Sequence, residues 1–142
     1  MKFWDSSGIV PLLVQQLRSE DAARLFQADP ELIVWWGARV ECVSALARLE
    51  REGALEVSAL SAALDRLQHL SVIWDEVQPT ERLRSTAERL LRVHQLRAAD
   101  SLQLAAMIEI GGDSQRDLDI VCFDERLAAA AVREGFRITG GD

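Results

Sequence analysis

The sequence predicts an α/β protein, a three-layer α/β/α sandwich around a central, mainly parallel sheet. The main observation is that short β-forming runs alternate along the chain with longer segments of helical periodicity. Such alternation is typical of βαβ units, which cover a parallel sheet with helices on both faces. No internal repeat, low-complexity tract or linker interrupts the pattern. We therefore expect one domain that spans residues 1–142.

Five segments are predicted to be strands, because each is apolar or β-branched and most are bounded by turn residues. The third carries the weakest signal, and the fourth carries a strong one. In chain order, the segments are 2–4, 32–36, 71–74, 118–123 and 136–139.

Helices are predicted between these strands from the three-to-four residue spacing of Leu, Val and Ala. Thr80 is a candidate N-cap for one of them, and Gly53 and the pair Gly111 and Gly112 are helix stops. The predicted helices cover residues 38–52, 57–70, 80–95, 99–110 and 125–133.

The composition narrows the classes of function. Cys42 and Cys122 sit in apolar contexts and His69 and His94 lie far apart, so neither a zinc site nor a disulfide framework is expected. No apolar run is long enough for a membrane span, and no secretory signal is recognisable at the start. We therefore expect a cytoplasmic protein without a membrane partner.

The net charge of −7 argues against broad electrostatic attachment to nucleic acid. A local concentration of arginines nevertheless occurs between residues 82 and 97. A solvated helix face with acidic partners explains it better than a binding surface. The arginines concerned are Arg82, Arg84, Arg89, Arg92 and Arg97.

Four carboxylates occupy related positions. Asp5 and Asp124 each stand where a predicted strand ends and a helix begins, Glu41 lies in the first turn of the helix after the second strand, and Asp100 opens an apolar helix. Taken singly, Asp5 and Asp124 are explained equally well by helix capping and by chemistry. Glu41 and Asp100 are better explained as N-caps or as partners of the helix dipole.

Taken together, the four acids suggest a common site, because the carboxyl ends of parallel strands are where α/β proteins bind ligands. Carboxylates drawn close together repel one another unless a cation neutralises them. A set of oxygen ligands without histidine or cysteine suits Mg²⁺ or Mn²⁺. Such a centre activates water and binds phosphate oxygens, which favours phosphodiester hydrolysis.

Four stretches of the sequence resemble the PIN domain, and more narrowly the VapC-type ribonuclease toxins of toxin–antitoxin pairs. The resemblance covers residues 2 to about 139. The stretches are FWDSS at 3–7, VECVSAL at 40–46, ADSLQLAA at 99–106 and VCFDERL at 121–127.

The resemblance implies a Mg²⁺- or Mn²⁺-dependent endoribonuclease with RNA as its substrate. Its catalytic and metal-binding residues would be Asp5, Glu41, Asp100 and Asp124, and Ser7 matches a small polar residue that helps to organise the site.

The resemblance also implies a homodimer and a cognate antitoxin partner whose tail lies in the acidic groove. The sequence departs from the pattern at one position, because Cys122 stands where many relatives have threonine. This departure puts one hydrogen bond in doubt. Arg82 and Arg97 are weak candidates for phosphate contacts, and solvated surface is the better account of both.

Three other functions compete with the toxin. A metal-dependent nuclease of RNA processing or of structured DNA ends would share the site, so only substrate tests separate it. A catalytically silent interaction module would use the same fold, but its sign would be a missing acid, and all four are present. A flavodoxin-like phosphate or nucleotide binder ranks last, because no glycine-rich loop follows the first strand.

Overall fold

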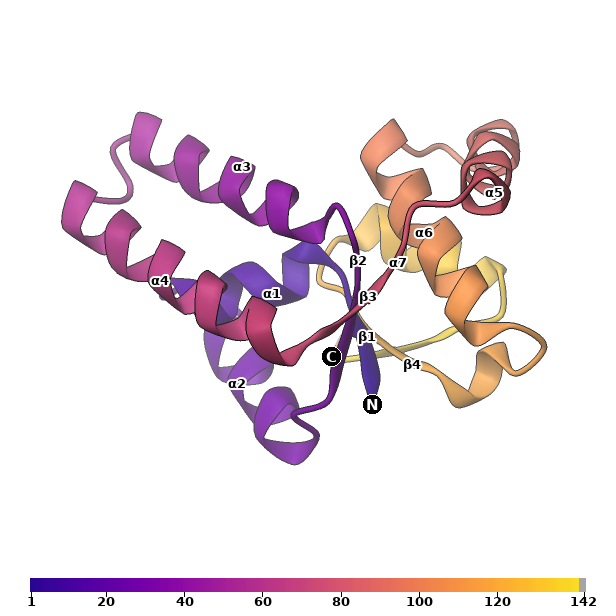
Figure 1. Cartoon of the computed structure of the whole chain (residues 1–142), viewed down its shortest axis with the longest axis horizontal. Coiled ribbons are helices and arrows are strands. Elements are labelled where there is room, and N and C mark those ends of the chain that lie inside the picture. Colours follow the sequence, from indigo (N-terminus) through magenta and orange to yellow (C-terminus); the bar gives the residue numbers. More distant parts are fainter. Residues whose placement is uncertain (141–142) are drawn as a thin grey trace.

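The structure, a computed structural model, describes residues 1–140, without the side chain of Arg116. A five-stranded, all-parallel sheet runs through the middle, and helices cover both of its faces (Figure 1). This architecture confirms the predicted three-layer α/β/α class. The sheet order is β3-β2-β1-β4-β5.

The strands are short, and four of the five coincide with predicted segments. The predicted strand at 71–74 is wrong: residues 71–73 end helix α4, and the strand follows them at Asp75. A short apolar segment inside an amphipathic helix has the same composition as a β-run, so periodicity does not separate the two. The strands are β1 Lys2–Trp4, β2 Leu32–Trp35, β3 Asp75–Val77, β4 Asp119–Val121 and β5 Arg137–Thr139.

All five predicted helices are present, with ends that shift by up to three residues. Thr80 caps α5 as expected, since its hydroxyl accepts a hydrogen bond from the backbone N–H of Leu83 at 3.1 Å. The sequence pattern gave no bounds for α1 and did not identify α2. The helices are α1 Ser6–Leu13, α2 Ser19–Ala28, α3 Ala38–Arg51, α4 Val57–Ile73, α5 Glu81–Val93, α6 Ala98–Gly111 and α7 Glu125–Arg133, with a short 3₁₀ turn at Gln115–Asp117.

The central strands are buried on both faces, as expected for a parallel sheet between helices. Phe3, Ile33 and Ile120 face a core built with α5, α6 and α7. Their neighbours in sequence, such as Trp4 and Val121, face a second core built with α1 to α4. The two-residue repeat of a strand thus divides the apolar residues between two layers.

Consecutive tryptophans at the end of β2 have different environments. Trp35 is buried in the core, whereas half of the surface of the Trp36 side chain is exposed. Both predicted core cysteines, Cys42 and Cys122, are free thiols and are buried.

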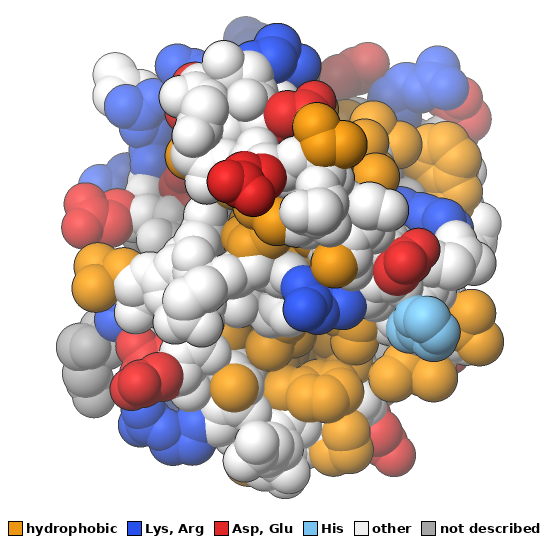
Figure 2. Space-filling view, turned by 90° about the vertical axis from the view of Figure 1, so that its left-hand side faces the viewer, with side chains coloured by type: hydrophobic (Ala, Val, Ile, Leu, Met, Phe, Trp, Pro, Cys, Tyr) orange, Lys and Arg blue, Asp and Glu red, His pale blue; other side chains and the backbone are white. Residues whose placement is uncertain are grey.

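One surface of the molecule is markedly apolar. Figure 2 shows hydrophobic side chains gathered there beside a histidine. A cavity of about 560 Å³ opens on α1, α2 and α4, lined by Leu12, Phe26, Arg66, His69, Leu70 and Ile73. Within residues 1–140, none of the helices combines the length and apolar character that a membrane crossing requires.

Candidate active site

The carboxyl ends of β1 and β4 meet at the point where the strand order reverses. In the sheet, β2, the next strand along the chain, lies on one side of β1, and β4 lies on its other side. The backbone N–H of Asp5 donates to the carbonyl oxygen of Val121 at 3.2 Å, so the two strand ends are joined directly. Ligands of open α/β sheets bind at such a reversal.

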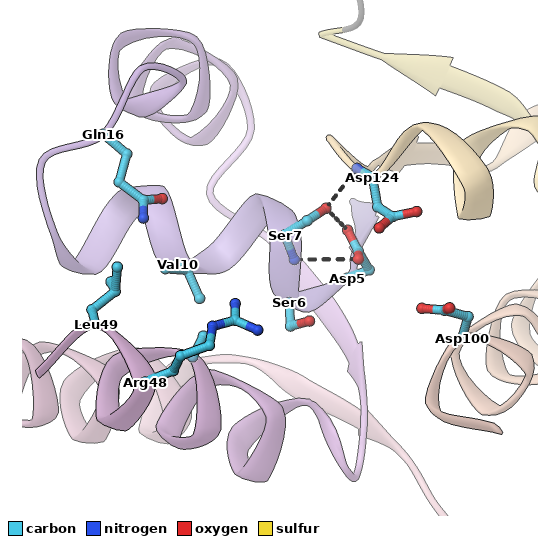
Figure 3. A pocket seen from close by; sticks show the side chains of 10 residues that line it. Asp5, Ser6, Ser7, Val10, Gln16, Arg48, Leu49, Asp100 and Asp124 are labelled. Carbon is cyan, nitrogen blue, oxygen red and sulfur yellow. Dashed lines mark hydrogen bonds between the residues drawn. The ribbon is translucent and has the colours of Figure 1, made fainter. Parts of the chain in front are cut away.

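A cavity of about 310 Å³ opens at this point, and three of the four predicted acids line it. Figure 3 shows the side chains of Asp5, Asp100 and Asp124 bordering the same space, each from a different part of the chain. Asp5 follows β1, Asp100 lies on α6, and Asp124 precedes α7. The fourth acid, Glu41, lies beside this cavity and does not line it.

Asp5 is the buried member of the group, with only 3% of its surface exposed. It caps α1: its Oδ2 accepts the backbone N–H of Ser7 at 3.2 Å, and its Oδ1 accepts the Ser7 hydroxyl at 2.7 Å. Burial raises the pKa of Asp5 from 3.8 to about 6, although the hydrogen bonds from Ser7 oppose the shift. The negative charge of Asp124 adds to the increase.

Ser7 organises this corner of the site. While its hydroxyl donates to Asp5, its oxygen accepts the backbone N–H groups of Phe123 at 2.8 Å and of Asp124 at 3.1 Å. One side chain therefore connects the β1–α1 junction to the β4–α7 junction (Figure 3).

Cys122 occupies the position at which threonine was expected from the resemblance. Its thiol donates to the carbonyl oxygen of Asp124 over 3.4 Å, and its sulfur lies 3.9 Å from the Ser7 hydroxyl. A weak thiol donor thus takes the place of a hydroxyl. Burial raises the pKa of this thiol far above its usual range, so Cys122 is an inert core residue.

Asp124 and Asp100 have different local roles. Asp124 is exposed and caps α7, with its Oδ1 accepting the backbone N–H of Leu127 at 2.8 Å. Asp100 is not an N-cap, because α6 begins two residues earlier at Ala98 and Arg97 occupies the N-cap position, without a side-chain capping hydrogen bond. Desolvation and the charge of Asp124 raise the pKa of Asp100, while the N–H and guanidinium of Arg97 lower it.

Glu41 lies in the first turn of α3, as predicted, and is partly buried. The Ser6 hydroxyl donates to its Oε1 at 3.2 Å, and Gln103 Nε2 donates to its Oε2 at 3.0 Å. Burial raises the pKa of Glu41 to about 7, and the charges of Asp5 and Asp100 add to the increase. This mutual influence places Glu41 in the same electrostatic group as the three acids of the cavity.

The donor set fits a hard divalent cation, since it consists of carboxylates whose pKa values are raised by burial and, to a smaller extent, by one another's negative charge. The acids do not form a closed cage as they stand. Within the described residues, no three acidic, cysteine or histidine side chains are close enough together to enclose an ion. The metal site therefore stays a prediction.

The structure adds residues that the sequence pattern did not single out. Gln103, which is 1% exposed, and Ser6 orient Glu41, and Arg48 lines the cavity with the acids. Gln103 lies three positions after Asp100 on the same helix face, a spacing that could have identified it.

Arg82 and Arg97, the weak candidates for phosphate contacts, have different places in the structure. A larger groove adjoins the acid cavity. Arg82 pairs with Glu109 at 3.2 Å and lines neither the cavity nor this groove. Arg97 lines that groove together with Asp100 and Asp124.

Comparisons with known proteins cover nearly the whole chain. No protein-family model matches it. Two curated relatives are ribonucleases of Mycobacterium tuberculosis, VapC45 of strain CDC 1551 / Oshkosh and VapC49 of strain ATCC 25618 / H37Rv. Each is 29% identical over 140 residues, which are 96% of this chain and 92% of the relative.

Solved structures show the same architecture. Mycobacterium tuberculosis VapC20, a sarcin–ricin loop cleaving toxin, superimposes with a TM-score of 0.70 at 23% identity, over 96% of both chains. FitAcB from Neisseria gonorrhoeae gives a TM-score of 0.66 at 15% identity, over 97% of this chain and 96% of the other. These likenesses show that the fold is PIN-like.

Proposed function

Because this chain is a homologue of the VapC ribonucleases and has their PIN-like fold, we propose that it is a metal-dependent endoribonuclease, the toxin of a toxin–antitoxin pair. The observation that carries the proposal is the cavity where β1 and β4 end. There, three separate segments bring Asp5, Asp100 and Asp124 together, with Glu41 beside them.

The four acids would hold Mg²⁺ or Mn²⁺. When bound, the cation supplies a Lewis acid that lowers the pKa of water and stabilises charge on phosphate oxygens. Carboxylates suit this role because they are hard oxygen donors, and among the described residues that line the cavity there is no competing thiolate or imidazole ligand.

The protein's own residues prepare the site in two ways. The Ser7 hydroxyl and N–H hold both oxygens of Asp5, so the buried carboxylate has one orientation. Gln103 and Ser6 hold the two oxygens of Glu41 in the same manner. Carboxylates that are already held in one orientation lose less conformational entropy when they bind an ion. Hydrogen-bonding residues behind a metal site usually have this role.

The test is cleavage of mixed RNAs by the purified chain in Mg²⁺ or Mn²⁺, and again with EDTA. We expect cleavage that requires the metal and that disappears in Asp5→Asn and Asp100→Asn, while circular dichroism shows both variants folded. Asp65→Asn is the matched control, since Asp65 is exposed on α4 and should leave activity unchanged.

The opposite result has a clear meaning. Retained cleavage in both purified site variants would reject the acid cluster as the active site. A folded, metal-loaded protein that cleaves no RNA would favour the silent interaction module, and cleavage of structured DNA in preference to RNA would favour the other nuclease class.

The proposal includes two protein partners, a second copy of the chain and an antitoxin. The second copy rests on the resemblance to the VapC-type toxins. The antitoxin has two further supports: a toxin requires an inhibitor in the cell that makes it, and the net charge of −7 favours a basic inhibitory segment. Light scattering of the purified chain distinguishes the 15.8 kDa monomer from a dimer of twice that mass.

A further inference from the structure

A second, larger groove adjoins the acid cavity. It has a volume of about 1000 Å³ and shares Arg48, Asp100 and Asp124 with the cavity. Three elements form its walls: α3, the start of α6, and the segment from the end of β4 into α7. Asp100 and Asp124 therefore lie in the wall of a groove much larger than the acid cavity itself.

Each wall of this groove carries one arginine. Arg48 comes from α3, Arg97 immediately precedes α6, and Arg126 lies in the first turn of α7. All three side chains are exposed. In Figure 3 the guanidinium of Arg48 points towards Ser6 and Asp5, across the cavity from Asp100.

None of these three guanidinium groups forms an ion pair with a carboxylate of the described residues. Across the part of the chain that the structure describes, none of them lies within 4.0 Å of an acidic oxygen, and Arg97 and Arg126 act on Asp100 through their charge. Several other arginines differ in this respect. Those paired with carboxylates are Arg18, Arg24, Arg82, Arg84, Arg89 and Arg137.

We propose that Arg48, Arg97 and Arg126 bind the phosphates of a single-stranded RNA on both sides of the bond that is cleaved. The inference rests on the proposed ribonuclease function and adds the residues that bind its substrate. Guanidinium groups suit this role, because their planar donors match phosphate oxygens and their charge persists at every physiological pH.

The negative charge of the whole molecule is the reason why positive side chains are needed beside the acids. We call Arg48, Arg97 and Arg126 together the arginine cradle. A net charge of −7 repels RNA at long range, and a cation at the acids compensates only the phosphate that reacts. The flanking phosphates need positive charge of their own if the strand is to stay in the groove. Because the arginines stand on three walls, the phosphates on either side of the acids have a partner.

Binding and cleavage can be measured separately. Binding of a labelled single-stranded RNA is followed in Mg²⁺ in an Asp100→Asn background, where no cleavage is expected, at several salt concentrations. Each substitution Arg48→Gln, Arg97→Gln or Arg126→Gln should weaken binding roughly three- to tenfold, and the slope of log affinity against log salt should fall by about 0.7 for each phosphate that no longer has an arginine partner.

Arg92→Gln is the matched control. Arg92 is also exposed and lies on α5 outside the groove, and its substitution removes the same charge. This variant should leave the affinity and the salt slope unchanged. In the wild-type background, the three groove variants should raise KM with little change in kcat, whereas a damaged catalytic site would lower kcat.

The outcomes distinguish failure of the arginine contacts from failure of the proposed ribonuclease function. If the triple Arg→Gln variant binds RNA as tightly as Arg92→Gln does, the arginine cradle is rejected, even if the wild type cleaves RNA. If the arginine variants lose binding but the wild type cleaves nothing, the cradle is supported and the ribonuclease is rejected. A wild-type chain that neither binds nor cleaves RNA overturns both.

Discussion

The hydroxyl oxygen of Ser7 lies 2.7 Å from Oδ1 of Asp5 and accepts the backbone N–H of Phe123 at 2.8 Å. It thus connects Asp5 to Phe123, which lies 116 positions after Ser7 and immediately before Asp124. The spacing between Asp5 and Asp124 depends on this one hydroxyl as well as on the pairing of β1 with β4.

Ser7→Ala should reduce both stability and cleavage. The change leaves the N–H groups of Phe123 and Asp124 without their acceptor and releases one oxygen of Asp5. An unsatisfied buried group costs about 1–3 kcal/mol. Because Phe123 is partly buried and Asp124 is exposed, we expect a loss of about 1 kcal/mol, at the low end of that range. Loss of a residue that orients metal ligands reduces activity about 10- to 100-fold. Urea unfolding and initial cleavage rates measure the two effects.

Ser6→Ala serves as the comparison. The Ser6 hydroxyl makes one longer bond, 3.2 Å to Glu41, and holds no backbone group. Its removal should cost less stability than the removal of the Ser7 hydroxyl. Equal destabilisation of the two variants would contradict the linking role of Ser7.

Gln103→Leu should move the pH dependence of cleavage to higher pH. The substitution removes the donor that stabilises charged Glu41, so the pKa of Glu41 should rise above its present value of about 7. A cation binds the deprotonated acid, and activity at neutral pH should therefore fall.

The measurement is the cleavage rate from about pH 6 to pH 9 for both proteins, a range that brackets the raised pKa of Glu41, with folding checked by circular dichroism. Higher pH should restore much of the activity of Gln103→Leu. An unshifted profile with a uniformly lower rate would mean that Gln103 acts only as a packing residue.

In EDTA, the protein should be less stable at about pH 8 than at about pH 5.5. The folded pKa of Asp5, about 6, exceeds its ordinary value of 3.8, so the folded state binds the proton more tightly. Stability therefore falls as pH rises from the unfolded pKa to the folded pKa, and it stays low above that window. At about 1.36 kcal/mol per pKa unit, the whole pKa shift of Asp5 is worth about 3 kcal/mol. Most of that stability is already lost at about pH 5.5, so Asp5 alone contributes about 1 kcal/mol to the difference between about pH 5.5 and about pH 8.

Glu41 acts in the same direction, because its pKa is also raised. Thermal unfolding at the two pH values measures the effect, and saturating Mg²⁺ should remove most of it by binding the charged forms. Asp5→Asn should lessen the pH dependence in EDTA. Equal melting temperatures for the metal-free wild type at both values would contradict the prediction.

Gly8→Ala should destabilise the protein by about 1–3 kcal/mol, as overpacking of a well-filled core does. A Cβ at position 8 would lie 3.0 Å from the carbonyl oxygen of Val121 and 3.2 Å from the ring of Trp4. The carbonyl belongs to β4 and cannot move without disturbing the sheet. Urea unfolding measures the loss, and an unchanged midpoint would show that α1 can move away from β4.

Much of the architecture was predictable because it depends on local pattern. Residues 125–133 form α7 as predicted, and Thr80 caps its helix, since periodicity and capping are properties of neighbouring residues. The same reasoning failed at 71–74, where the apolar run belongs to α4. Near the N-terminus it left α2 unrecognised, because that helix is short and polar with only two buried residues.

An acid that caps a helix can also take part in the chemistry of the site. Asp5 and Asp124 are both N-caps, and both line the cavity. A helix that begins directly after a strand places its first residue at the edge of the sheet. The carboxylate that caps the helix therefore also faces the position where a ligand binds.

The amino-acid sequence alone was enough to predict the three layers and four of the five strands, because these follow from short-range periodicity and composition. The four acids also stood out in the sequence, both by their places near strand ends and helix starts and through the resemblance to the PIN domain. Only the tertiary structure decided which strand ends are neighbours, that Gln103 and Ser7 hold the acids, and that Arg48 and Arg126 stand beside them. Strand order and side-chain partners depend on contacts between residues far apart in the chain, and no local pattern encodes those contacts.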